Sequence, residues 1–168
     1  MASSDYDLPL RPRRLRKTRN IRRMARETRL STDDLIAPLF VMAGDNQREE
    51  VPSMPDAYRH TIDRLVDHAE TLHALGIPAV ALFPALPDHL KTPDAEHALD
   101  PDHLYPNAIR ALKDAVPELM IITDTALDPY NSDGHDGIVR DGRIDNDATI
   151  QVMCEMAVLH AEAGADII

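Results

Sequence analysis

Short apolar runs alternate along this sequence with segments of helical periodicity, and this alternation limits the fold more than any other feature. Four runs have the length of a strand: LIAPLFV at 35–41, AVALFP at 79–84, LMIIT at 119–123 and ADII at 165–168. Their apolar character is continuous, which is typical of strands buried on both faces of a parallel sheet. The sequence therefore predicts an α/β fold in which these runs form parallel strands.

The segments between the later runs repeat apolar residues at helical spacing. Helices are expected over three ranges: 62–75, 107–116 and 147–163. Gly76 and Gly164 stand where C-terminal caps are common, and Asp147 is the candidate N-cap of the last helix. Pro38 lies inside the first apolar run and suggests a local irregularity there. Each expected helix connects two expected strands.

Strand–helix–strand repeats build a parallel sheet with right-handed crossovers. Residues 31–168 are therefore expected to form either a small open α/β sheet or half of a (β/α)8 barrel. A last strand at 165–168 has no following element to cover its edge, and an uncovered edge is unfavourable. We therefore expect the chain to be an N-terminal portion of something larger, or a truncated product.

Charge is distributed unevenly along the chain. The net charge is −11, yet residues 1–30 carry ten Arg or Lys against three acids, which leaves −18 for the rest. A basic N-terminal arm of this kind can bind nucleic acid, or it can lie on the acidic surface of another copy. The absence of Trp and the 4% aromatic content weaken a base-stacking interpretation.

Composition also bears on the compartment. No apolar run approaches the length of a membrane span, and the N-terminus lacks the apolar stretch of a signal peptide. A single cysteine, Cys154, excludes an internal disulfide framework and a zinc ribbon. We expect a cytoplasmic protein without a membrane partner.

The loop TDTALDPYNSDGHDG, residues 123–137, is the richest in chemistry. Asp124 follows an apolar strand directly, and active sites of parallel α/β folds form at the C-terminal ends of strands. Three further aspartates and one histidine follow in the same loop: Asp128, Asp133, His135 and Asp136. The spacing does not fit an EF-hand, and one histidine is too few for zinc. A hard-cation site and a solvated, turn-rich loop both remain open.

Other reactive side chains point to structural roles. Cys154 stands between Met153 and Glu155 in an expected helix, and a packed core thiol is the interpretation we favour. Three histidines in or beside the first helix, His60, His68 and His73, are expected in surface or capping positions. No phosphate-binding or dinucleotide-binding glycine motif is present.

The lysines are few: Lys17 in the arm, Lys91 in a loop and Lys113 in a helix. None ends an expected strand, where a Schiff-base lysine would be expected.

Several segments, taken in order, resemble the delta-aminolevulinic acid dehydratase family, also called porphobilinogen synthase. The resemblance covers nearly the whole chain. It rests on RPRRLRKTRNIRRMARETRLSTDDLIAPLFV, VPSMPDAYR, LGIPAVALFP, NAIRALK, TDTALDPYNSDGHDG and AGADII. The family implies a (β/α)8 barrel that condenses two molecules of 5-aminolevulinate into porphobilinogen in tetrapyrrole (haem) biosynthesis. Residues 31–168 would be the first half of that barrel, and residues 1–30 the arm.

The resemblance also implies roles for individual residues. Asp124 matches the family's active-site aspartate, and Thr125 stands where valine is more usual. Ala126, Asp128 and Asp136 stand where zinc-dependent members carry three cysteines. This pattern resembles the aspartate-rich, zinc-independent branch, with Mg²⁺ or K⁺ as the expected cation.

The family's two Schiff-base lysines have no counterpart here, so the resemblance implies that this chain has no turnover alone. It further implies that the arm wraps a neighbouring subunit in a homo-octamer, which displaces the nucleic-acid interpretation. The alternative is a non-catalytic half-barrel that assembles with a partner chain through its arm and open edge.

Overall fold

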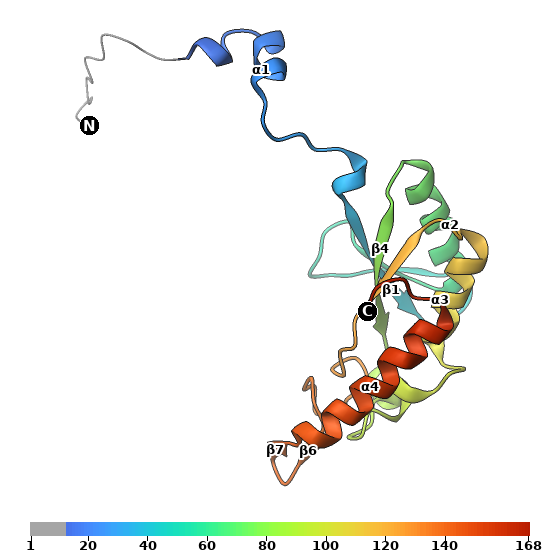
Figure 1. Cartoon of the computed structure of the whole chain (residues 1–168). Coiled ribbons are helices and arrows are strands. Elements are labelled where there is room, and N and C mark those ends of the chain that lie inside the picture. The colour runs from blue at the N-terminus through green and yellow to red at the C-terminus, as the bar shows by residue number, and fades with distance from the viewer. Residues whose placement is uncertain (1–12) are drawn as a thin grey trace. The chain divides into compact units, whose positions relative to one another are not determined.

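The basic arm and the rest of the chain form two units, Met1–Ser31 and Thr32–Ile168, in the computed structural model, which describes residues 13–168 (Figure 1). Residues 1–12 of the predicted arm lie outside the described residues. The described part of the arm contains a 3-10 turn, η1 (Arg14–Arg16), and a short helix, α1 (Arg19–Ala25). Thr18 caps α1 by accepting a hydrogen bond from the backbone N–H of Ile21 at 3.2 Å. Neither element buries a residue.

The second unit is built on a five-stranded sheet of order β2-β3-β1-β4-β5. Strands β1 (Ile36–Met42), β4 (Ala79–Ala85) and β5 (Met120–Thr123) pair in parallel, and they coincide with three predicted apolar runs. Strand β3 (Tyr58–His60) also pairs in parallel with β1, and only β2 (Arg48–Glu50) is antiparallel to its neighbour. The predicted α/β fold with a mainly parallel sheet is confirmed.

Three helices connect and cover these strands: α2 (Ile62–Ala74), α3 (Leu104–Ala115) and α4 (Asn146–Ala163). Helix α3 begins three residues before the predicted start, because Pro106 is tolerated in the first turn of a helix. The predicted N-cap of α4 is wrong. Asp145, not Asp147, accepts the capping hydrogen bond, from the backbone N–H of Ala148 at 3.1 Å.

Two of the expected boundaries of the sheet differ from the structure. The segment before α2, predicted as a polar loop, contains β2 and β3. The last run, 165–168, makes one parallel bridge, between Ile122 and Ile167, rather than a strand. Its backbone does follow β5, because the N–H of Thr123 donates to the carbonyl of Ile167 at 2.9 Å.

A short hairpin, β6 (Val139–Arg140) and β7 (Arg143–Ile144), precedes α4. Its two turn residues, Asp141 and Gly142, have φ values of 51° and 73°. Positive φ at both central positions is the requirement of a type I′ turn, for which Asp-Gly is a preferred pair. The Asp-Gly dipeptide was therefore a usable sequence signal for this hairpin.

Helices α2 and α3 lie on the same side of the sheet in Figure 1, and both contact β1. The main core lies between these helices and the strands, and it includes Leu39, Leu65, Leu82, Ile109 and Ile121. The opposite side of the sheet is apolar and uncovered in residues 13–168: Ile36 is 56% exposed and Met120 is 41% exposed. Phe40 and Phe83 contact each other in the middle strands, with ring centroids 5.6 Å apart.

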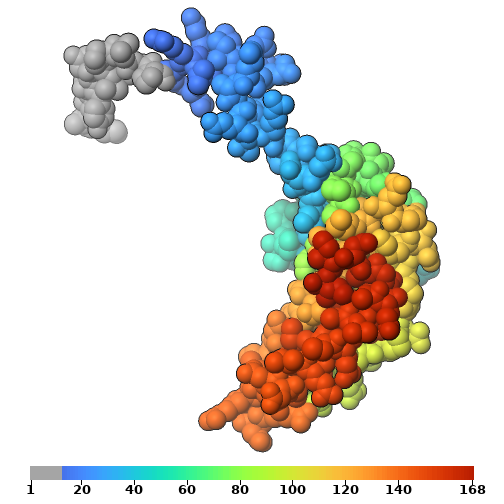
Figure 2. All heavy atoms as spheres, in the orientation of Figure 1, coloured from blue at the N-terminus to red at the C-terminus, as the bar shows by residue number. Residues whose placement is uncertain are grey.

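Helix α4, orange to red in Figure 2, forms much of the visible surface of the second unit. Below it lies a second core cluster of loop and helix residues: Leu86, Ala95, Ala98, Leu127, Tyr130, Ile138 and Met156. Cys154 is exposed on this helix, so the prediction of a packed core thiol is wrong. No helix within residues 13–168 combines the length and the apolar character needed to cross a bilayer.

Candidate functional site at the strand ends

Asp124 is the first residue after β5, so the parallel sheet places it at the C-terminal edge of the strands. Its side chain is exposed, and the backbone of Asp124 hydrogen-bonds to the buried Tyr105. The Tyr105 hydroxyl donates to the backbone carbonyl of Leu82 at 2.5 Å. Burial raises the pKa of Tyr105, the backbone N–H of Asp124 acts in the opposite direction, and the Asp124 carboxylate raises that pKa further. Tyr105 therefore stays a neutral hydrogen-bond donor beneath the candidate carboxylate.

The Asp136 carboxylate stabilises the loop by a hydrogen bond to the loop's backbone. Its Oδ1 accepts from the backbone N–H of Leu127 at 2.6 Å, which joins the two ends of the loop. The side chain of Asn131 is buried and donates to the carbonyl of Gly137 at 3.1 Å. Asn131 Oδ1 also accepts from the backbone N–H of Asp133 at 2.6 Å. The loop is thus folded on itself, and the backbone of Leu127 engages one Asp136 oxygen.

Asp128 lines a hollow of about 520 Å³ at the C-terminal ends of β1 and β4. Met42 and Pro84 contribute apolar walls from the strands, and Lys91 contributes a cation from the following loop. Lys91 Nζ also lies 3.3 Å from Asp88 Oδ1. The sequence analysis had placed Lys91 only in a loop. Lys91 reaches the hollow because the chain folds back on the strands, and no residue near Lys91 in the sequence predicts this position.

The three predicted aspartates do not line a common hollow. Asp128 lines the hollow, whereas Asp124 and Asp136 are not among its lining residues. Across residues 13–168, no three His, Cys, Asp or Glu side chains lie close enough together to hold a metal ion. The donor chemistry of the loop is that of carboxylate oxygens, which suits hard cations, but these residues alone do not make a complete metal site.

A buried group of rings lies beneath the loop, and the sequence analysis missed it. The ring of His160, on α4, is 1% exposed and meets the ring of Tyr105 edge-on at 4.9 Å. Burial lowers the pKa of His160 to about 4, so the imidazole is neutral at pH 7. His103 stacks on His97 with centroids 4.7 Å apart and contacts the buried Tyr130. His160 is four residues after Met156, and this helical spacing was the available signal for its burial.

Comparison with known proteins agrees with this architecture. Residues 9–168 match the family model described as delta-aminolevulinic acid dehydratase. The chain belongs to the delta-aminolevulinic acid dehydratase family. It is 47% identical over 167 residues to delta-aminolevulinic acid dehydratase of Bradyrhizobium diazoefficiens, covering 99% of this chain and 47% of that protein. It is 45% identical over 165 residues to the enzyme of the same name from Chlamydia pneumoniae, covering 98% of this chain and 50% of that protein.

A solved structure of this family has the same fold. The chain superposes on delta-aminolevulinic acid dehydratase of Toxoplasma gondii with a TM-score of 0.88 and 41% identity, covering 95% of this chain and 46% of that chain. The Toxoplasma enzyme was crystallised in complex with the reaction product porphobilinogen. The present chain spans about half the length of these relatives.

Proposed function

We propose that this chain supplies one half of the active site of a porphobilinogen synthase, which condenses two molecules of 5-aminolevulinate into porphobilinogen. Family membership and the likeness to a structure that holds porphobilinogen support this proposal. The observation that carries it is the position of Asp124 directly after β5, at the same edge of the sheet as the hollow that contains Asp128 and Lys91. Catalytic groups of α/β barrels gather at this edge.

The architecture that we propose is the first half of a (β/α)8 barrel. Parallel sheets are normally covered on both faces, whereas here helices contact one side and apolar residues such as Ile36 and Met120 stay exposed. In a closed barrel this uncovered side would face the interior and pack against the remaining strands. The same uncovered side supports the alternative, a non-catalytic half-barrel that assembles with a partner chain.

Within the active site, we assign Asp124 as the catalytic carboxylate. Its neighbour Tyr105 is a positioning residue, because the buried hydroxyl lies against the Asp124 backbone. We further propose that the chain is of the aspartate-rich, zinc-independent type. Ala126 offers no metal ligand, and Asp128 and Asp136 offer only oxygens, which favour Mg²⁺ or K⁺ over zinc. A cation bound there would require ligands from outside residues 13–168, and we derive no catalytic step from it.

The positions of the lysines support an active site that this chain supplies only in part. Lys113 pairs with Asp166 at 2.9 Å on the helical side, and Lys91 occupies a loop beside Asp88. Neither ends a strand, and Lys17 belongs to the arm. We propose that the Schiff-base lysines come from outside this chain and that the chain alone has no turnover.

For the arm we propose a contact with another subunit of a homo-octamer. Helix α1 has only seven residues, and so short a helix is marginal in water without a packing partner. Met24 is 87% exposed and Leu30 is 76% exposed, beside the arm's arginines. Exposed apolar side chains amid a basic segment favour an acidic protein surface over nucleic acid.

The test is a chimera of the Bradyrhizobium diazoefficiens relative in which this chain replaces the matching segment. We expect the chimera to form porphobilinogen from 5-aminolevulinate, without inhibition by a zinc chelator. Asp124→Asn should reduce kcat by ~10²-fold or more, the scale of a lost acid–base group. Asp133→Asn, an exposed aspartate of the same loop, is the matched control and should leave kcat unchanged.

Two results would contradict the proposal. One is a soluble, octameric chimera in which Asp124→Asn and Asp133→Asn have the same kcat. The other is formation of the pyrrole by the 168-residue chain alone.

A further inference from the structure

A second hollow lies between the β2–β3 pair and helix α2, beside His60 at the end of β3. Its volume is about 450 Å³, and it is lined by Asn46, Arg48, His60, Arg64, Asp67, His68 and Thr71. None of these residues lines the hollow that contains Asp128. The lining is almost entirely polar and includes two arginines, two histidines and one carboxylate. This is a notable composition on a unit whose net charge is −18.

The two histidines form a stacked pair. Their ring centroids are 5.1 Å apart and their planes differ by 11°. His60 is 6% exposed, and its Nδ1 has no hydrogen-bond partner among the described residues. The prediction of a surface or capping role is therefore wrong for His60. A buried polar atom without a partner is costly, so a hydrogen-bond partner that reached this ring from the hollow would stabilise it.

The electrostatics of the pair favour a negative ligand. Burial lowers the pKa of His60, and the neighbouring His68 and Arg48 lower it further. Burial and Arg48 lower the pKa of His68 in the same way. Poor solvation thus disfavours the charged form of both imidazoles, and the Arg48 guanidinium acts in the same direction. An anion placed between these groups would relieve both effects.

The arginines are held in place. The Arg48 guanidinium lies 4.2 Å from the centroid of the Tyr58 ring, and within residues 13–168 it forms no ion pair. Arg64 Nη1 lies 3.1 Å from Asp67 Oδ2, which engages one of its five N–H donors. A planar guanidinium that stacks on a ring keeps its N–H edge free for an oxyanion.

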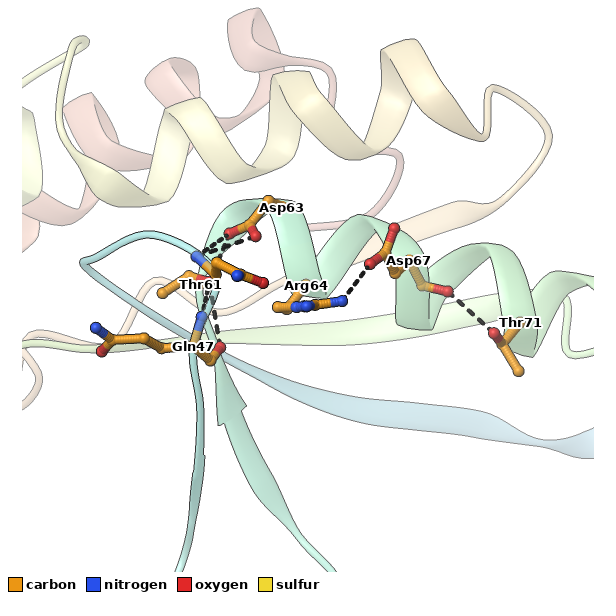
Figure 3. Close-up of polar contacts among 7 residues, drawn as sticks. Gln47, Thr61, Asp63, Arg64, Asp67 and Thr71 are labelled. Atoms are coloured by element: carbon orange, nitrogen blue, oxygen red, sulfur yellow. Dashed lines mark hydrogen bonds and ion pairs between the residues drawn. The ribbon is translucent and has the colours of Figure 1, made fainter.

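The wall of this hollow is preorganised (Figure 3). The backbone N–H of Asn46 donates to both carboxylate oxygens of Asp63, at 3.2 and 3.1 Å. The N–H of Gln47 donates to Thr61 Oγ1 at 3.0 Å, and the Thr61 hydroxyl lies 2.5 Å from Asp63 Oδ1. These bonds tie the segment before β2 to the first turn of α2. Arg48, which follows directly, therefore starts from a fixed backbone.

We propose that this hollow binds a small tetrahedral oxyanion, such as phosphate or the phosphoryl group of a phosphate monoester, between Arg48, Arg64 and the His60–His68 pair. Two guanidinium groups and two imidazoles supply more hydrogen-bond donors than a carboxylate ligand could accept from, which favours a tetrahedral oxyanion. Asp67 remains paired with Arg64, and this pairing limits the site to a modest net positive charge. The ligand would lie outside the hollow that contains Asp128.

The experiment titrates the full 168-residue chain with inorganic phosphate, sulfate, a phosphate monoester and acetate. Binding is followed through the ring ¹H–¹⁵N NMR signals of His60 and His68. We expect phosphate and sulfate to shift both histidines with saturation, and a tighter response to the monoester would identify an organic ligand. Arg48→Gln should weaken binding by tenfold or more. Arg59→Gln removes an arginine of neighbouring β3 that pairs with Glu49, and it should bind as the wild type does.

Three results would overturn the proposal. The first is the absence of saturable shifts at His60 and His68 with phosphate and with sulfate. The second is binding of acetate in preference to both. The third is equal affinity of folded Arg48→Gln and Arg59→Gln, with folding of each variant checked by its backbone NMR spectrum.

Discussion

The buried imidazole of His160 should make the stability of this chain depend on pH. Its pKa is about 4 in the folded chain, against an ordinary value of 6.5, because burial penalises the charged ring. The unfolded chain therefore binds a proton more readily between these two values, and folding stability rises with pH across that window. The contribution is complete above pH 6.5 and is lost as the pH falls from 6.5 to about 4.

The size of the effect follows from the same two values. At pH 5 the unfolded ring is almost fully protonated and the folded ring almost fully neutral. Moving the chain from pH 8 to pH 5 should therefore cost about 2 kcal/mol of unfolding free energy through His160 alone. Other histidines with lowered pKa values, such as His60 and His103, add to the same trend. A comparison of variants is needed to isolate His160.

The assay is urea unfolding followed by far-UV circular dichroism at pH 8 and at pH 5. His160→Phe keeps an aromatic ring against Tyr105 and removes the titration, so the loss between the two pH values should be smaller than in the wild type by about 2 kcal/mol. His89→Gln, an exposed histidine, is the matched control and should follow the wild type. The reasoning is refuted if His160→Phe and wild type lose the same free energy.

Two further substitutions test the packing around the loop. Tyr105→Phe removes the hydroxyl that donates to the Leu82 carbonyl and should lower the free energy of unfolding by ~1–3 kcal/mol, the cost of a buried unpaired carbonyl; a urea midpoint equal to that of the wild type would contradict this. Gly137→Ala would place a Cβ 2.8 Å from Ile144 Cγ2 and should cost ~1–3 kcal/mol through overpacking. Adding Ile144→Ala should recover part of that loss, and no recovery in the double variant would argue against the clash.

Much of the fold could be predicted because its signals are local. The strands β1, β4 and β5 are continuous apolar runs, and α2 to α4 carry apolar residues at helical spacing, so each element appears within a few residues of its prediction. Gly76 and Gly164 have positive φ values, as predicted caps should. The position of Asp124 after β5 follows from the same alternation.

Other features depended on contacts between distant segments. Both Cys154 and Met156 are apolar residues of α4, yet Cys154 is exposed and Met156 is buried, because α4 packs one particular face against the second core cluster. The segment predicted as a loop forms β2 and β3, and the pairing of these two strands makes the edge of the sheet.

By itself, then, the sequence determined the alternation of strands and helices, the basic arm, and the family through its motifs, because these depend on residues close together in the chain. Only the tertiary structure decided which groups meet. It placed Asp128, but not Asp124 or Asp136, in the wall of the hollow at the strand ends, brought Lys91 to the same wall, and stacked His60 on His68 beside Arg48. Side chains many residues apart become neighbours only when the sheet and helices pack, and burial then sets their charge.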